Sequence, residues 1–306
     1  ATLIMGDHGE SLGDHGEATH GMLVFESAVR IPLIVRTNGL SAANRTDPAS
    51  VIDVLPTVLA LAGLPAEGLP GRSLTAAPAP ETATYLESEY PTVAGWSPVR
   101  SLVQDRWKLV VAGRPRLFDL TADPGETTDR AATHASTVRA MVSHVTALSR
   151  SGPGPAVPER ISAETAARLR SLGYVAPSAM PTAAVARVDP ADAMGVWIEF
   201  ERAQAEVAAG HAAAALPALA RAARLHPASP LFASSYARAL AAAGRSGEAL
   251  TRFREAVEKW PGDAELYHDL AVVARERGFR AEALRAEDAA LAINPALPSA
   301  HHGKGL

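Results

Sequence analysis

The chain has 306 residues, of which 47% are hydrophobic and 20% are charged, and this size and composition suit about two globular domains. The formal net charge of −4 argues against nucleic acid, or an anionic membrane surface, as the main partner. Cysteine is absent, which excludes disulfides, thiolate zinc sites and cysteine nucleophiles from these residues, and no apolar run approaches the ~20 residues of a membrane helix.

The clearest chemical signal lies at the start of the chain. Residues 2–5 are predicted to end a buried strand, and Asp7 and His8 follow it between glycines. A carboxylate and an imidazole at the carboxyl end of a strand are placed to hold a metal ion, and glycines let the backbone bend close to that ion. Oxygen and nitrogen donors together suit Zn²⁺ or Mn²⁺, whereas Ca²⁺ prefers oxygen donors alone. Because so little sequence precedes this strand, we expect the chain to be the rear part of a larger enzyme.

The next segments alternate between the two kinds of regular structure. A compact β-branched run at residues 31–36 predicts a second buried strand. Apolar residues at helical spacing predict a helix over residues 51–62. Strands that alternate with helices favour an α/β layer with a mainly parallel sheet.

Between residues 76 and 130 the pattern changes to short, closely spaced apolar runs, which predict a small antiparallel sheet. We expect Trp96 and Trp107 to pack between this sheet and the main domain. A helix is predicted over residues 133–148. The Pro- and Ala-rich stretch 151–190 predicts a linker that contains a short helix at about 163–172. The short runs lie at residues 84–87, 99–103, 107–111 and 116–120.

The last third of the chain, residues 191–306, repeats with a period of 34 residues. This period predicts tetratricopeptide repeats, which are helix–turn–helix units that stack into an all-α solenoid. The predicted repeats cover about 194–227, 228–261 and 262–295, and their concave groove would bind a protein or peptide partner. The recurring residues are Gly210, Gly244 and Gly278; Ala215, Ala249 and Ala283, each followed by leucine; and Pro227, Pro261 and Pro295.

Several segments in the first half share their order and spacing with one enzyme family. They are Gly6–Gly16, His20-Gly21, Phe25-Glu26, Val29–Ile34, Asp53–Thr57, Ala62-Gly63, Gly71–Leu74, Gly95–Ser101, Trp107–Leu109, Leu117–Leu120 and Asp123–Glu126. Over residues 1–150 the chain resembles the C-terminal half of a sulfatase of the alkaline phosphatase superfamily. Leu169–Tyr174 resembles the segment that follows such domains when a repeat array is attached. The resemblance implies a partial alkaline-phosphatase-like α/β sheet with a small antiparallel C-terminal sheet, followed by the all-α solenoid.

The family hydrolyses sulfate or phosphate-type esters with one or two divalent metal ions, so the resemblance implies an anionic ester as substrate and Zn, Mn or Ca as cofactor. It makes Asp7 and His8 metal ligands and places His15 at the rim of the active site. His20 lies about where many relatives have a lysine that contacts the sulfate or phosphate oxygens, and it departs from that pattern in residue type. A histidine near a developing alkoxide could also donate the proton that the leaving group needs, and His15 and His20 are candidates for this catalytic role.

Three functions stay open at this point. The first is a metal-dependent hydrolase of sulfate esters with a protein-interaction repeat array. The second is a phosphodiesterase or phosphotransferase of the same superfamily, and the third is a non-catalytic repeat scaffold. The family's nucleophile motif, Cys-x-Pro-x-Arg or Ser-x-Pro-x-Arg, does not occur in the 306 residues, so we expect these residues alone to be inactive. The resemblance favours a periplasmic or secreted location.

Overall fold

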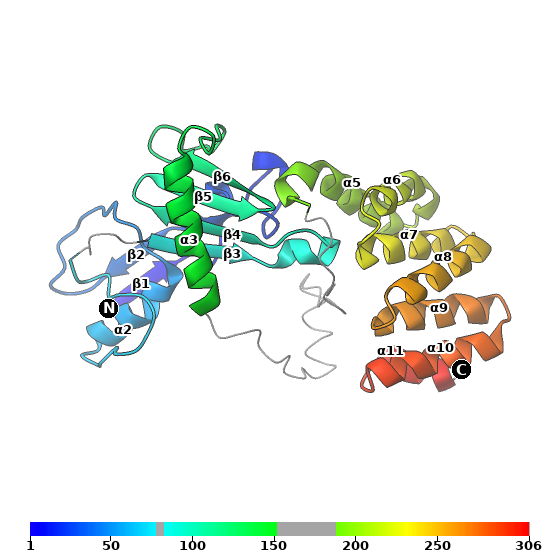
Figure 1. Ribbon diagram of the computed structural model, residues 1–306. Coiled ribbons are helices and arrows are strands. Elements are labelled where there is room, and N and C mark those ends of the chain that lie inside the picture. The colour runs from blue at the N-terminus through cyan, green and yellow to red at the C-terminus, as the bar shows by residue number, and fades with distance from the viewer. Residues whose placement is uncertain (78–82, 152–187, 306) are drawn as a thin grey trace. The chain divides into compact units, whose positions relative to one another are not determined.

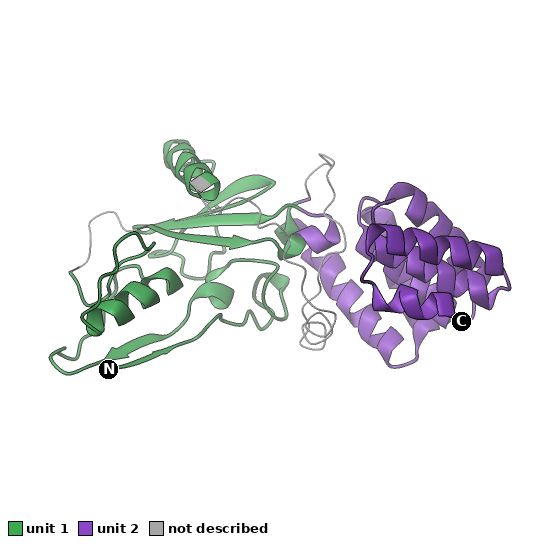
Figure 2. Ribbon diagram, turned by 90° about the horizontal axis from the view of Figure 1, so that it is seen from below, with its two compact units in different colours: residues 1–91, 97–154, 189–191 green, residues 92–96, 155–188, 192–306 purple. Residues whose placement is uncertain are grey.

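The computed structural model describes residues 1–77, 83–151 and 188–305 (Figure 1). These residues form two compact units (Figure 2), with residues 1–91, 97–154 and 189–191 in the first and residues 92–96, 155–188 and 192–306 in the second. Most of the predicted linker, including its short helix at 163–172, lies outside the described residues, as does the segment Leu169–Tyr174.

The first unit begins with a two-stranded sheet of β1 (Thr2–Met5) and β2 (Leu33–Arg36). The two strands pair antiparallel, with Ile4 opposite Ile34, so the prediction of a mainly parallel sheet is wrong for them. A parallel pair needs a long crossover, usually a helix, and the segment between these strands contains only the four-residue helix α1 (Glu26–Val29) and the 3₁₀ turn η1 (Asp14–Gly16).

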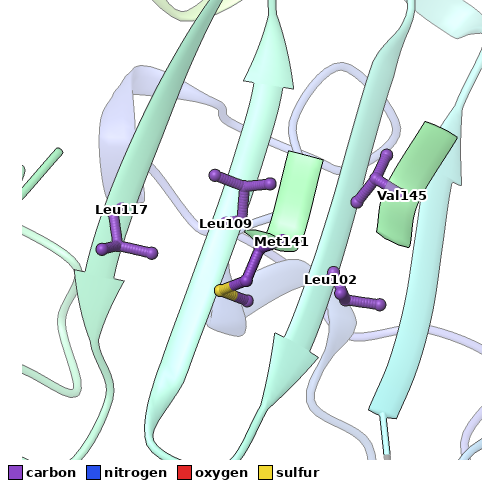
Figure 3. Packing of buried hydrophobic residues seen from close by; sticks show 5 residues of the cluster. All are labelled: Leu102, Leu109, Leu117, Met141 and Val145. Atoms are coloured by element: carbon purple, nitrogen blue, oxygen red, sulfur yellow. The ribbon is translucent and has the colours of Figure 1, made fainter. Parts of the chain in front are cut away.

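A second, four-stranded antiparallel sheet lies in this unit, as the short runs predicted. Its strands pair in chain order: β3 (Ala83–Ser88), β4 (Val99–Gln104), β5 (Trp107–Ala112) and β6 (Arg114–Asp119). Helix α3 (Ala135–Ser151) packs across one face. Alternate strand residues point to that face and form a core with two residues of the helix (Figure 3). The fully buried members of this core are Leu102, Leu109 and Leu117, joined by Met141 and Val145.

The predicted helix at 51–62 begins as the 3₁₀ turn η2 (Val51–Asp53) and continues as α2 (Val54–Leu61). The carboxylate of Asp53 is buried and accepts hydrogen bonds from the backbone amides of Ser50 and Arg72. Several apolar side chains of this unit stay in solvent. Ile4 and Ile34 are each 57% exposed. Leu55 and Val58 on α2 are each about half exposed.

The second unit is a stack of antiparallel helix pairs, which confirms the tetratricopeptide-like array. The helices are α5 (Pro190–Ala208), α6 (Ala212–Leu225), α7 (Pro230–Ala242), α8 (Ser246–Lys259), α9 (Ala264–Glu276), α10 (Arg280–Ile293) and α11 (Pro298–Gly305). The recurring Gly210, Gly244 and Gly278 have positive φ, the conformation that ends a helix and suits glycine. The recurring alanines and Leu219 and Leu250 are buried between helices.

The segment of the 3₁₀ turn η3 (Tyr90–Ala94) contributes residues to the core of this second unit. The ring of Trp96 is buried against Trp197, Phe232 and His226, and its indole N–H donates to Nδ1 of His226 at 3.2 Å. The prediction placed Trp96 between the small sheet and the main domain, and its ring contacts in the structure are with residues of the helix array. Trp107 lies in the first unit, beside the α3 core. Across residues 1–77, 83–151 and 188–305, no helix combines the length and the apolar character that a membrane span requires.

Candidate metal and anion site

The loop after β1 presents Asp7 and His8 and is fixed by backbone contacts on both sides. The amide of Gly6 donates to the carbonyl of Pro32 at 3.2 Å, which extends the β1–β2 ladder by one residue. The amide of Gly9 donates to the carbonyl of Ala28 in α1 at 2.7 Å. A Cβ atom at Gly9 would lie 2.4 Å from the carbonyl oxygen of Ser27, so only glycine lets the loop approach α1 this closely.

The hydrogen bonds of His8 leave one ring nitrogen free to act as a ligand. Its Nδ1 atom lies 2.7 Å from the carbonyl oxygen of Gly9, which makes Nδ1 the protonated donor and leaves the Nε2 lone pair available. Oδ1 of Asp7 accepts from the His8 amide at 3.0 Å. Backbone hydrogen bonds at Asp7 and His8, and the His8 ring, hold the pKa of the Asp7 carboxyl below its ordinary value, so that carboxyl is ionised at neutral pH. An ionised carboxylate beside a free imidazole nitrogen fits a divalent metal ion.

His20 lies directly beside this pair, because its ring stacks on the ring of His8 with the centroids 3.7 Å apart. Its Nδ1 atom lies 3.2 Å from Oε2 of Glu10. One donor atom each of His8, Glu10 and His20 lies within 4.8 Å of the others, a set that could hold a cation. Glu10 was not among the residues that sequence reasoning selected. Its position two residues after His8, in a loop that folds back on itself, is the only signal that could have pointed to it.

The side chain of His15 does not join His8 and His20 but packs elsewhere in the first unit. Its ring stacks on Phe25 with the centroids 3.6 Å apart, and its Nε2 atom lies 3.2 Å from the carbonyl oxygen of Glu126. The backbone of His15 has φ of 49°, a left-handed conformation that turns the side chain toward this seat. The structure therefore brings His20 together with His8, while the contacts of His15 are with Phe25, Asp14 and Glu126.

A buried glutamate and a buried lysine hold the loop in place. Glu17 is buried, and its carboxylate accepts from the amides of Met22 and Leu23, at 2.6 and 3.2 Å, which closes the loop that carries His20. Burial raises the pKa of Glu17. Lys108 on β5 is also fully buried, and its Nζ atom lies 3.0 Å from Glu26 of α1. These buried contacts tie the loop and α1 to the rest of the first unit, and the sequence did not predict them.

Asp7 and His8 line a pocket of about 260 Å³ within the first unit. Its other walls are mostly apolar and come from β1, α1, β2, η2, the start of α2, and β3. The side chains of Asp7 and His8 stand at the open side of this pocket, where 91% of the Asp7 side chain and 46% of the His8 side chain are exposed to solvent. The geometry thus offers a carboxylate and an imidazole nitrogen at one small cavity, and a second histidine stacked on that imidazole.

Comparison with known proteins gives two family matches. Residues 2–64 match the family described as Sulfatase, and residues 234–273 match the tetratricopeptide repeat. The chain is 35% identical to the uncharacterized sulfatase YidJ of Escherichia coli (strain K12) over 131 residues and 33% identical to the choline-sulfatase of Rhizobium meliloti (strain 1021) over 136 residues. These matches cover 40% and 42% of the chain, and it spans about a quarter of each relative, 26% in both cases.

Among solved structures, the chain is similar to YrrB, described as a tetratricopeptide-repeat protein with an unusual peptide-binding site. The identity is 28% and the TM-score is 0.35, with 38% of the chain and 62% of that protein covered.

Proposed function

From a chain whose residues 2–64 are a sulfatase-family segment, followed by tetratricopeptide repeats, we propose a metal-dependent hydrolase of sulfate esters with a repeat array that binds a protein or peptide. One observation carries the catalytic part of this proposal. The Gly9 carbonyl holds Nδ1 of His8, which leaves Nε2 free beside the ionised carboxylate of Asp7.

In this proposal, Nε2 of His8 and the carboxylate of Asp7 hold the divalent cation. A bound divalent cation would supply the positive charge that the oxygens of a transferring sulfuryl or phosphoryl group require. In this proposal, His20 carries a proton on Nδ1, which it donates to Oε2 of Glu10. The ring of His20 can then contact a substrate oxygen or give a proton to the leaving group.

A nucleophile is the missing part. The 306 residues contain no cysteine and no Ser-x-Pro-x-Arg segment, so we propose that hydrolysis needs residues beyond these. The same observation favours a second candidate, a non-catalytic scaffold in which the repeats bind a partner and the first unit has no turnover.

The test uses the complete open reading frame that encodes this chain. We expect turnover of 4-nitrophenyl sulfate that chelation abolishes and that Asp7→Asn lowers by about a hundredfold or more, a loss in the range reported for groups that stabilise transition-state charge. The chain itself offers a matched control, because Asp14-His15-Gly16 repeats the tripeptide Asp7-His8-Gly9 with its histidine seated elsewhere. Asp14→Asn should leave both turnover and Mn²⁺ affinity unchanged.

The possible outcomes separate the candidates. Turnover of bis(4-nitrophenyl) phosphate without turnover of the sulfate ester would favour the phosphodiesterase. Lack of turnover on every ester, together with a Mn²⁺ affinity that Asp7→Asn does not change in a titration, would favour the scaffold.

A further inference from the structure

A second cavity lies in the repeat array, between α6, α7 and α8, the helices drawn in yellow-green to yellow-orange in Figure 1. Its volume is about 480 Å³, within the range of ligand-binding pockets. The floor and walls are small or aromatic, and the rim is charged. The residues that line it are Ala220, Ala223, Arg224, Pro227, Ala233, Tyr236, Arg252, Glu255, Ala256, Lys259 and Trp260.

The rim carries more positive than negative charge, with three cations and one carboxylate. Arg252 donates to Glu255 at 2.8 Å, which neutralises that pair. Nζ of Lys259 lies 2.5 Å from the carbonyl oxygen of Pro227 and 5.0 Å from the centroid of the Trp260 ring, which hold its charge at the pocket. No acidic side chain pairs with it in the part of the chain that the structure describes. Arg224 is exposed at the end of α6. The pocket is thus electrostatically suited to an acidic ligand.

The repeat period shows that this chemistry is not required for stacking the helices. The equivalent junction of the next repeat lies 34 residues later, where the cations are replaced by Glu258, Ala286 and Ile293 and the tryptophan by Asn294. The alanines that leave the pocket open are replaced by larger side chains, Arg254 for Ala220 and Tyr267 for Ala233. The same scaffold therefore stacks with larger side chains at two of these positions and without the three cations at positions 224, 252 and 259.

Each repeat has a first and a second helix, and α7 and α9 are the first helices of two successive repeats. The pocket lies apart from the surface along which α7 and α9 pack. Arg238 of α7 forms an ion pair with Asp269 of α9 at 2.7 Å, and this pair marks the side of α7 that faces α9. The pocket is built instead on residues 233 and 236 of α7 with the second helices α6 and α8. Arg238 and Tyr236 are about 200° apart around the helix, so they belong to different faces.

We propose that this pocket binds an acidic peptide segment in which one apolar side chain is flanked by carboxylates. The apolar side chain enters the space between the alanines and Trp260, and the carboxylates meet Arg224 and Lys259. The inference rests on the proposed binding role of the array, and it replaces the concave groove by a specific pocket on α6, α7 and α8.

The test uses the full chain and a fluorescein-labelled peptide with a central leucine between aspartate and glutamate in a glycine–serine background. Fluorescence anisotropy should show saturable binding that is lost when the leucine is replaced by serine or the acids by their amides. Arg224→Glu, which introduces the residue of the next repeat, should weaken binding about tenfold or more. Ala233→Tyr and Ala220→Arg, which fill the cavity as the next repeat does, should weaken it similarly.

Two matched variants serve as controls. Arg221→Glu changes a charge on the same helix outside the pocket and should leave the affinity unchanged, and a thermal melt of every variant shows whether the array is still folded. If Arg238→Gln weakens binding and the pocket variants do not, the pocket is the wrong site while the binding role of the array stands. If the peptide does not bind at all, the inference is wrong, and the Asp7→Asn metal titration still tests the hydrolase on its own.

Discussion

The ammonium group of Lys108, which is fully buried, lies 3.0 Å from Oε1 of Glu126. The same ammonium group reaches Glu26 at 3.0 Å, and Oε2 of Glu126 accepts from the Glu26 amide. Burial raises the pKa of Glu126, and the Lys108 charge opposes that rise. This cluster joins β5, α1 and the turn after β6, and the carbonyl of Glu126 also receives the His15 ring. It therefore fixes the helix against which the Asp7–His8 loop rests.

Replacing Lys108 by methionine should destabilise the first unit by about 3–5 kcal/mol, because the carboxylates of Glu26 and Glu126 would lose their positively charged partner. Hydrogen exchange of the β5 amides measures this as a loss of protection. The double variant with Glu126→Gln should recover much of the loss, since it removes one of the unpaired charges. Unchanged protection in the single variant would contradict the structural role of the cluster.

The pH dependence of the first unit should include a component from Asp47. Oδ2 of Asp47 lies 2.6 Å from both Arg45 and Arg72, and the Arg45 hydrogen bonds lead in lowering the pKa of Asp47 from 3.8 to about 2. The lowered value means that the folded state gains stability wherever the carboxylate is charged, at pH above about 4. That gain, about 2 kcal/mol, should be lost as the pH falls from about 4 to about 2. Calorimetry of the chain and of Asp47→Asn checks this, because the variant should lack the change in that window.

Substituting Gly9 by alanine should weaken divalent metal binding more than it lowers stability. The new Cβ would meet the Ser27 carbonyl at 2.4 Å, so the loop must move away from α1 and take His8 with it. Overpacking of this kind costs about 1–3 kcal/mol. Titration with Mn²⁺ gives the readout. Gly125→Ala is the control, because a Cβ there would only touch the Thr127 side chain at 3.7 Å, and equal affinities in the two variants would argue against a role for the loop.

Trp96→Ala should destabilise the repeat array by about 3–5 kcal/mol, because a buried aromatic side chain is removed from the cluster of Trp197 and Phe232. It also deprives the ring of His226, whose pKa burial lowers, of the indole donor on Nδ1. Thermal unfolding of the array in the full chain measures the effect, and Trp96→Phe should lose less. An unchanged array transition would show that residues 92–96 are not part of its core.

Local pattern predicted most of the elements. The four short runs became β3 to β6, and the 34-residue period corresponds to the stacked helix pairs, because spacing of apolar residues and turn glycines determines such elements locally. Asp7 and His8 could be selected for the same reason, since strand end, glycines and residue type are adjacent in sequence.

The features that could not be predicted from the sequence are contacts between residues that lie far apart in the chain. Lys108 meets acids 82 residues before it and 18 residues after it, and nothing in its strand distinguishes a buried lysine from an exposed one. Trp96 finds its partners more than 100 residues further along the chain. The antiparallel pairing of β1 and β2 depends on how the intervening loop returns, which composition does not specify.

The pairing of Ile4 with Ile34 leaves two branched aliphatic side chains side by side in water on a short ribbon. Exposed apolar side chains on an edge strand favour self-association, so the oligomeric state of a purified sample should depend on its concentration. The protein should stay monodisperse in dilute solution with a mild detergent. In concentrated solution it should aggregate through this ribbon unless another polypeptide surface covers the two isoleucines.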